Sequence, residues 1–92
     1  YLSIMGVIAI KRIFTRREFV VFKIDDYFLL VNTNKPFDFG HTHLRSFNAC
    51  ISIIKLIEKK QLPNSKSRHF MESILRVCDD KVYSEKIKQL RG

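Results

Sequence analysis

Residues 37–43, Phe-Asp-Phe-Gly-His-Thr-His, divide the chain into two parts of different character. Before them the sequence is rich in β-branched and aromatic residues, which favour strands. After them apolar residues recur at three- and four-residue steps, which is typical of an amphipathic helix. We therefore expect strands and helices to be segregated on either side of this stretch, which is the pattern of an α+β fold.

The part before the junction predicts three strands, over residues 7–14, 19–24 and 27–31. Thr15-Arg16-Arg17 interrupts the first two runs, and Asp25-Asp26 joins the last two as a tight turn without the usual glycine. Together the three strands would form a small antiparallel sheet with one face that needs cover. Residues 32–40, which include Pro36, predict a loop.

The part after the junction predicts two to three helices packed against that sheet. The first would begin at Thr42 or His43, with Thr42 as its N-cap, and would end near residue 60. Ser65 or Ser67 would cap a second helix, and Asp79-Asp80 would end it and cap a third. The apolar stripe of the first helix consists of Leu44, Phe47, Cys50, Ile51, Ile54 and Ile57. The whole chain, 1–92, is short enough for a single domain.

The composition is strongly basic, with 17 Lys and Arg against 9 Asp and Glu and a net charge of +8. Such a charge on a small domain attracts polyanions, and nucleic acid is the leading candidate because phosphate neutralisation converts charge directly into affinity. The alternative is that the charge only keeps the protein soluble. A hydrophobic fraction of 46% excludes a wholly disordered chain.

Cysteine content and hydropathy bear on location. Cys50 and Cys78 do not make a disulfide framework, and both fall in apolar surroundings, so we expect free buried thiols and a reducing, cytoplasmic environment. The longest apolar run, residues 4–10, ends at Lys11-Arg12 and is too short to span a bilayer. A membrane partner is therefore not expected.

His41 and His43 are the first candidates for chemistry. Side chains two residues apart in an extended segment point the same way, which would suit a metal ion. A tetrahedral site would still need ligands such as Asp38, His69 or a cysteine, and no paired ligand spacing occurs. No glycine-rich phosphate loop is present either, so neither a metal nor a cofactor is expected. The two histidines would then bond backbone groups around the loop.

Two other roles for this stretch remain open. His41 and His43, with Tyr27, Lys35 and Arg45 as plausible neighbours, could shuttle protons around a phosphate, as in a small metal-independent nuclease. Alternatively, the amides of residues 42–45 at a helix start would bind an anion without catalysis. Gly40 would allow close backbone approach to that anion, or would simply supply a turn with positive φ.

Basic residues elsewhere would extend a binding surface. Leu62-Pro63-Asn64 lacks the compact glycine-containing turn of a helix-turn-helix, so that motif is not expected. Lysines and arginines cluster instead in the first hairpin and around the connection between the first two helices. The residues predicted to contact nucleic acid or a partner are Arg16, Arg17, His41, His43, Arg45, Lys59, Lys60 and Arg68.

Several segments resemble a group of small uncharacterised proteins from phages and mobile elements of low-GC Gram-positive bacteria. The resemblance covers residues 27–90. It is carried by Phe-Leu-Leu-Val-Asn-Thr-Asn-Lys-Pro at 28–36, Gly-His-Thr-His-Leu at 40–44, Leu62-Pro63, Ser-Ile-Leu-Arg-Val at 73–77, Asp80, Tyr83 and Lys86-Ile87. The group gives no residue a role. What it implies is a small basic protein that binds nucleic acid or blocks host defence systems, including CRISPR nucleases.

These observations together predict a non-enzymatic binding protein whose partner is nucleic acid or a host nucleoprotein. It would act as an accessory or anti-defence factor of a mobile element. The nuclease that uses His41 and His43 is one alternative. The other alternative is a structural or dimerising module, which could form a homodimer and whose charge would be incidental.

Overall fold

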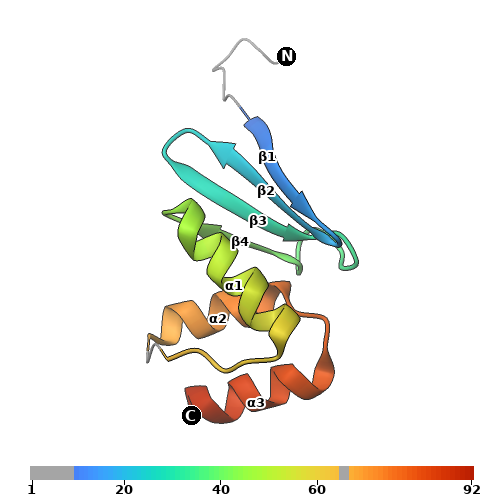
Figure 1. Ribbon diagram of the computed structural model, residues 1–92, viewed down its shortest axis with the longest axis vertical. Helices are drawn as coiled ribbons and strands as arrows, with labels where there is room; N and C mark the ends of the chain where they lie inside the picture. Colours follow the sequence, from blue (N-terminus) through green and yellow to red (C-terminus); the bar gives the residue numbers. More distant parts are fainter. Residues whose placement is uncertain (1–9, 65–66) are drawn as a thin grey trace.

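A computed structural model of the chain describes residues 10–64 and 67–92. The first three residues of the predicted strand 7–14, and Ser65 as a helix cap, lie outside this range. The elements in chain order are β1 (Ile10–Arg16), β2 (Phe19–Ile24), β3 (Tyr27–Asn32), β4 (His41–Leu44), α1 (Phe47–Lys59), α2 (Arg68–Val77) and α3 (Lys81–Arg91). Strands precede helices, so the α+β class is confirmed (Figure 1).

The strands form one antiparallel sheet in the order β1-β2-β3-β4. β2 occupies its predicted range, and β3 extends one residue beyond it to Asn32. β1 continues to Arg16, because Thr15 and Arg16 pair with Val20 and Phe19. Arg17 and Asp25 begin the two hairpin turns with φ of 56° and 50°, in the left-handed region that usually favours glycine. A non-glycine residue therefore supplies each tight turn.

The fourth strand corrects the sequence prediction. A helix was expected to begin at Thr42 or His43, but His41–Leu44 forms β4 and pairs with β3 from Val31 to Phe28. The four residues alternate between the two faces of the sheet, with Thr42 and Leu44 buried against the helices. The Thr42 hydroxyl donates to Ser73 Oγ on α2 at 2.9 Å and caps no helix.

The helices begin and end at recognisable capping groups. The N-cap of α1 is Ser46, whose hydroxyl accepts from the Ala49 amide at 3.1 Å, and Lys60 ends that helix with φ of 55°. Ser67 and Asp80 cap α2 and α3 as predicted. No described helix is both long and apolar enough to cross a membrane.

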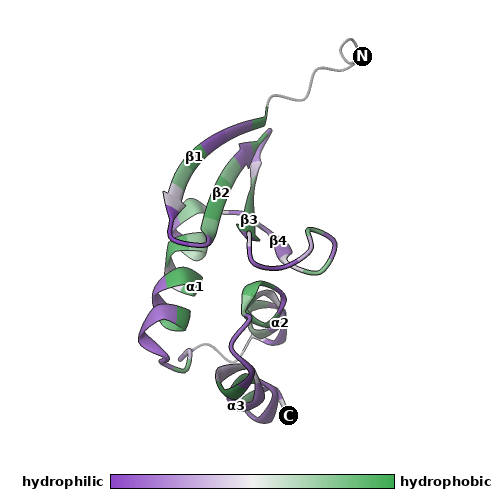
Figure 2. Cartoon of the chain, turned by 90° about the vertical axis from the view of Figure 1, so that its right-hand side faces the viewer, coloured by the Kyte–Doolittle hydropathy of each residue, from purple (hydrophilic) through white to green (hydrophobic). Residues whose placement is uncertain are grey.

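The hydrophobic core lies between one face of the sheet and the helices (Figures 1 and 2). Phe47 of α1 packs against Phe14 of β1 and Phe28 of β3, with ring centroids 5.7 and 6.2 Å apart. Cys50 and Cys78 are free and buried in this core, as expected. The fully buried side chains include Phe19, Val21, Leu30, Ile53, Ile54, Ile74, Val77 and Ile87.

The loop between β3 and β4 is held in place at both of its ends, by hydrogen bonds at Asn32 and by close packing at Gly40. Asn32, fully buried, donates from Nδ2 to the Val77 carbonyl at 2.8 Å, and its Oδ1 accepts from the Asn34 amide at 2.8 Å. A Cβ on Gly40 would lie 2.6 Å from the Cβ of Lys35, while the φ of Gly40 is not positive. Close approach, not a positive φ, therefore requires this glycine.

We predict that Asn32→Ala lowers the free energy of unfolding by about 2 kcal/mol, because it leaves the buried Val77 carbonyl without a partner. Urea unfolding followed by circular dichroism measures the change. Asn34→Ala is the matched control, since the Asn34 side chain is exposed and its loss should cost less than about 0.5 kcal/mol. Equal losses in the two variants would contradict the role given to Asn32.

Candidate functional site

One face of the sheet is left open by the helices. In Figure 2, α1 lies on one side of the sheet, and none of the helices within residues 10–64 and 67–92 lies against the other side. The strand register places on this second face, here called the open face, the residues Ile10, Arg12, Thr15, Val20, Phe22, Ile24, Tyr27, Leu29, Val31, His41 and His43. No carboxylate occurs in this set of strand residues.

The centre of the open face is apolar but shielded. Ile24, Leu29 and Val31 are only 7–8% exposed, and they pack against the half-buried rings of Phe22 and Tyr27. Around these buried aliphatic side chains the face presents aromatic rings, and at its β1 edge it also presents the exposed Ile10, Arg12 and Thr15. This surface differs from an exposed aliphatic patch, which usually marks a protein-docking surface.

Four rings form a continuous row along β4, here called the ring row. Phe37 stacks on His41 with centroids 4.3 Å apart and planes 6° apart. His41 meets His43 edge to face at 5.2 Å, and His43 meets Tyr27 in the same manner at 5.2 Å. The row thus runs from the loop after β3, along β4, to the first residue of β3.

Backbone contacts hold the loop end of this row. The His41 ring nitrogen Nδ1 donates to the Phe37 carbonyl, which brings the two rings together. Arg76 of α2 donates from Nε to the His41 carbonyl at 2.7 Å and from Nη2 to the Asp38 carbonyl at 3.0 Å. Lys35 in turn donates to the Arg76 carbonyl at 2.9 Å. The loop is therefore fastened to the C-terminal half of α2.

Positive charge flanks the ring row. Among the residues that the structure describes, the Arg76 guanidinium bonds only neutral carbonyls, and the exposed Arg45 has no ion pair. At the Tyr27 end, a hollow of about 380 Å³ is lined by Tyr27, His43, Leu44, Arg45 and His69. An adjoining hollow is lined by Asp26 together with Tyr27 and Arg45. A flat ligand with a negative charge fits this combination of rings and cations.

The pKa of His43 is lowered from 6.5 by partial burial of the imidazole, and further by the nearby His41 and Arg76. The lowered pKa favours the neutral form of the His43 ring at neutral pH. This ring offers a hydrogen-bonding edge and an aromatic face, while Arg45 and Arg76 supply the charge.

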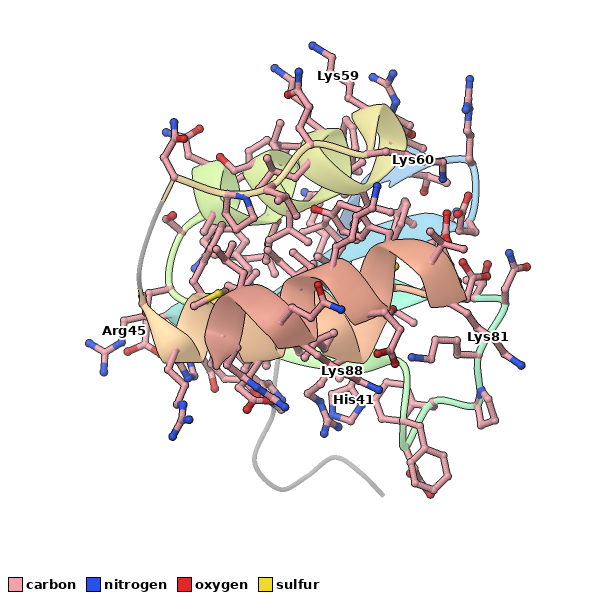
Figure 3. The ribbon with its side chains drawn as sticks, turned by 90° about the horizontal axis from the view of Figure 1, so that it is seen from below. His41, Arg45, Lys59, Lys60, Lys81 and Lys88 are labelled. Atoms are coloured by element: carbon pink, nitrogen blue, oxygen red, sulfur yellow. The ribbon has the colours of Figure 1, made fainter. Side chains whose placement is uncertain are left out.

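Other predicted contact residues lie elsewhere on the molecule. In Figure 3, Lys59 and Lys60 project on the side of α1, away from His41 and Arg45. Arg16 pairs with Glu58 of α1 at 2.9 Å, and Lys60 pairs with Asp80, whose pKa the hydrogen bond from Lys60 lowers. The remaining two predicted residues are exposed, Arg17 in the β1–β2 turn and Arg68 beside His69 at the start of α2.

The structure therefore separates the predicted set. It brings His41, His43 and Arg45 together around the ring row. It places Arg16, Lys59 and Lys60 around the C-terminal half of α1, where two of these three cations are already paired with carboxylates.

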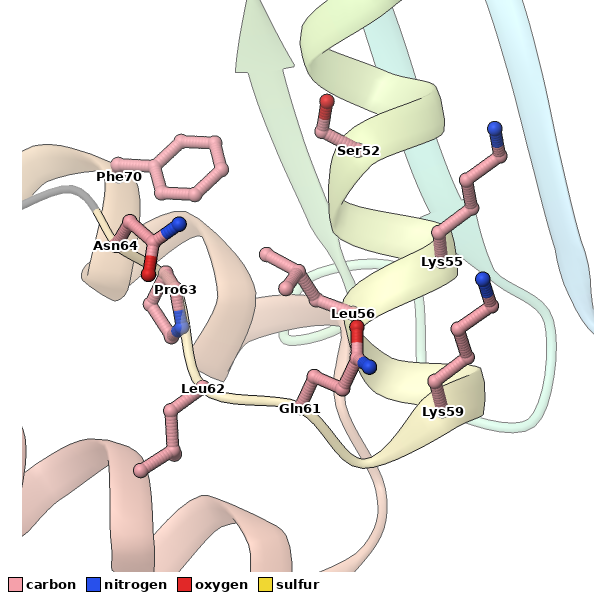
Figure 4. A pocket seen from close by; sticks show the side chains of 9 residues that line it. All are labelled: Ser52, Lys55, Leu56, Lys59, Gln61, Leu62, Pro63, Asn64 and Phe70. Carbon is pink, nitrogen blue, oxygen red and sulfur yellow. The ribbon is translucent and has the colours of Figure 1, made fainter.

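A second concave surface lies beside α1. A groove of about 650 Å³ separates the helix from the segment that leads to α2, and Figure 4 shows Leu56 and Phe70 facing it from opposite sides. Lys55 and Lys59 line its outer edge, and Leu62 is 45% exposed in it. This groove contains no ring row and no histidine.

The predicted anion site at residues 42–45 needs revision. The anion site was expected at the amides of residues 42–45, but these precede the helix, and residues 42–44 lie in β4. The first helix starts only after Ser46, whose side chain already caps it. For a metal ion, no group of three or more His, Cys, Asp or Glu side chains comes together within residues 10–64 and 67–92.

Sequence reasoning missed Phe37 and Arg76 as members of this site, because it assigned Phe37 only to a loop and Arg76 only to a helix. Tyr27 was a plausible neighbour of the two histidines in the nuclease alternative, but sequence spacing alone does not show that these side chains converge. One signal was present: His41 and His43 alternate with Thr42 and Leu44, as expected of a short strand that exposes both imidazoles on one face.

No model of a protein family matches this chain, and neither the curated proteins nor the solved structures give a match. Function is therefore inferred from the residues and their geometry.

We predict that His43 titrates below pH 6.5 in the folded protein, because partial burial and the neighbouring His41 and Arg76 side chains disfavour its protonated form. NMR titration of the imidazole protons measures this, with the urea-unfolded chain as the reference. Since the unfolded state binds the proton more readily, the free energy of unfolding should fall as the pH drops below 6.5. A midpoint at or above the unfolded value would contradict the proposed surroundings of His43.

Proposed function

We propose that this protein binds nucleic acid, alone or within a nucleoprotein, through the ring row and the cations that flank it. The observation that carries the proposal is the ring row itself, with Arg45 and Arg76 beside it on a chain of net charge +8. Aromatic faces interleaved with cations suit a ligand made of flat bases and phosphates.

Other polyanions fit these residues less well. An anionic lipid surface or an acidic protein would engage the cations but would leave the rings without a matching flat partner. Nucleic acid engages both, because phosphates meet the cations while bases meet the rings. The ring row therefore favours nucleic acid among the ligands that the net charge alone would allow.

A nucleoprotein of the host defence system is the partner class that the resemblance to mobile-element proteins suggests. An inhibitor of such an assembly, a CRISPR nuclease included, would need to cover a nucleic-acid channel or its guide. A small basic protein with an aromatic surface suits that task, and its free, buried cysteines suit the reducing cytoplasm where the assembly works.

Self-association through the free edge of β1 is disfavoured. This strand carries Lys11, Arg12 and Arg16, and its register with β2 shifts between Arg12 and Phe14. Lysines, arginines and bulges on an edge strand oppose the addition of another strand. A dimerising role for this edge therefore has little support.

We expect the protein to bind labelled DNA and RNA with an affinity that falls steeply between about 50 and 200 mM salt. Arg45→Ala should weaken binding several-fold and reduce the slope of log affinity against log salt by about 0.7–0.9, the contribution of one phosphate contact. Fluorescence anisotropy measures both quantities.

Lys86→Ala is the control, because it removes the same charge from an exposed position on α3, far along the chain from the ring row. Binding that is absent, or that does not respond to salt, would refute direct recognition of nucleic acid. If Arg45→Ala and Lys86→Ala weaken binding equally, net charge alone accounts for the binding of nucleic acid.

A metal-independent nuclease is the second candidate, since the rings of His41 and His43 lie 5.2 Å apart and the lowered pKa of His43 favours its neutral form. His41 donates from Nδ1 to the Phe37 carbonyl, which leaves its Nε2 as the atom that can exchange a proton with a ligand. One imidazole as base and one as acid is a workable arrangement for RNA cleavage.

A cleavage assay on RNA in the presence of a chelator decides between the two candidates. The binding proposal predicts intact RNA. Cleavage by the wild-type protein that disappears in the His41→Ala/His43→Ala variant, while that variant stays folded, would establish the nuclease instead. Unfolding of the variant would show that the two histidines stabilise the loop and β4.

A further inference from the structure

We propose that the ring row binds single-stranded nucleic acid in preference to a duplex, by stacking unpaired bases on its exposed rings. This inference rests on the proposed function and names the form of nucleic acid that the site accepts. It applies equally to DNA and RNA, since both present the same flat faces when unpaired.

The exposure of the rings is the first argument. Phe37 is 55% exposed at the loop end of the row, and His43 is also exposed in the middle. A base inside a duplex has a neighbouring base pair on each face, so it has no face to offer a protein ring. Only an unpaired or displaced base can stack on such a ring.

The spacing of the rings is the second argument. From His41 to His43 and from His43 to Tyr27 the centroids are 5.2 Å apart, and the planes are tilted by 86° and 66°. Bases in B-DNA follow one another at about 3.4 Å along each strand, in parallel planes. These two steps are wider and tilted, in contrast to the parallel Phe37–His41 pair, and they match a strand whose bases are splayed rather than the stack of a duplex.

The placement of the row is the third argument. It follows β4 on the open face of an antiparallel sheet, whereas a protein that reads a duplex usually inserts a helix or a β-ribbon into the major groove. β4 is joined on one side to β3, and α2 bonds it through Thr42 and Arg76. A strand of nucleic acid can lie along this face without entering a groove.

The flanking groups fit the backbone of such a strand. Arg45 lies at the Tyr27 end of the row and lines the hollow of about 380 Å³ with His43 and His69. Arg76 lies beside His41 toward the other end, where its guanidinium bonds two carbonyls. The hollow at the Tyr27 end would receive one base or one phosphate, and Arg45 would neutralise the adjacent charge.

The test compares labelled single strands of DNA and RNA with a duplex of the same length and sequence, by fluorescence anisotropy at one salt concentration. We expect the single strands to bind about tenfold or more tightly than the duplex. Phe37→Ala should weaken single-strand binding by about fivefold or more, the loss typical of one stacked base, and should leave duplex binding unchanged.

Phe39→Ala is the matched control, because Phe39 lies in the same loop, is 69% exposed and makes no ring contact with a described residue. Tyr27→Leu is a second variant, which removes a ring and keeps an apolar side chain on the sheet. Unfolding midpoints of all three variants show that each is folded.

Three results would overturn the inference. The first is a duplex that binds as tightly as the single strands. The second is equal binding by the Phe37→Ala and Phe39→Ala variants. In both cases nucleic-acid binding itself, and with it the proposed function, would stand. The third is absence of binding to every oligonucleotide, which would remove the proposed function as well.

Discussion

The side chain of Asn32 joins the parts of the molecule on which the candidate site depends. It ends β3, donates to the last carbonyl of α2 and receives the amide of Asn34 in the loop, while its own backbone amide donates to the Gly40 carbonyl at 2.9 Å. A single buried residue, through its side-chain and backbone amides, therefore fixes the positions of α2, the loop and the start of β4 together. Because a buried polar group without partners is costly, this arrangement leaves little freedom for alternatives.

The ring row follows from that constraint. β4 can pair with β3 only if the loop closes tightly, which the close contact between Gly40 and Lys35 permits. Once β4 is extended, His41 and His43 must share a face, opposite Thr42 and Leu44. Their exposure is thus a consequence of burying Thr42 against Ser73 of α2.

Local signals in the sequence were sufficient for some elements and not for others. β2 and β3 were predicted within a residue, because long runs of β-branched and aromatic residues identify strands, and the Ser67 and Asp80 caps were recognised from residue type. β4 was missed because four residues are too few to show a period, and because a threonine that can cap a helix can equally bond a buried serine. For the site, the shared face of the two histidines was foreseen for an extended segment. The contact of His43 with Tyr27 joins distant parts of the sequence, and the contact of His41 with the nearby Phe37 depends on how the loop folds. The pairing of Arg16 and Lys60 with carboxylates likewise depends on tertiary structure.

The burial of both thiols has a practical consequence for the study of this surface. Burial raises the pKa of Cys50 to about 11, and Cys78 is 4% exposed with its sulfur held by the Asp80 backbone. Thiolates react with maleimides and thiols do not, so the native cysteines will be nearly silent at neutral pH. A single cysteine introduced at an exposed loop position near the ring row would therefore take a fluorophore or spin label selectively. Background labelling of the wild-type protein should therefore be low without removal of its native cysteines.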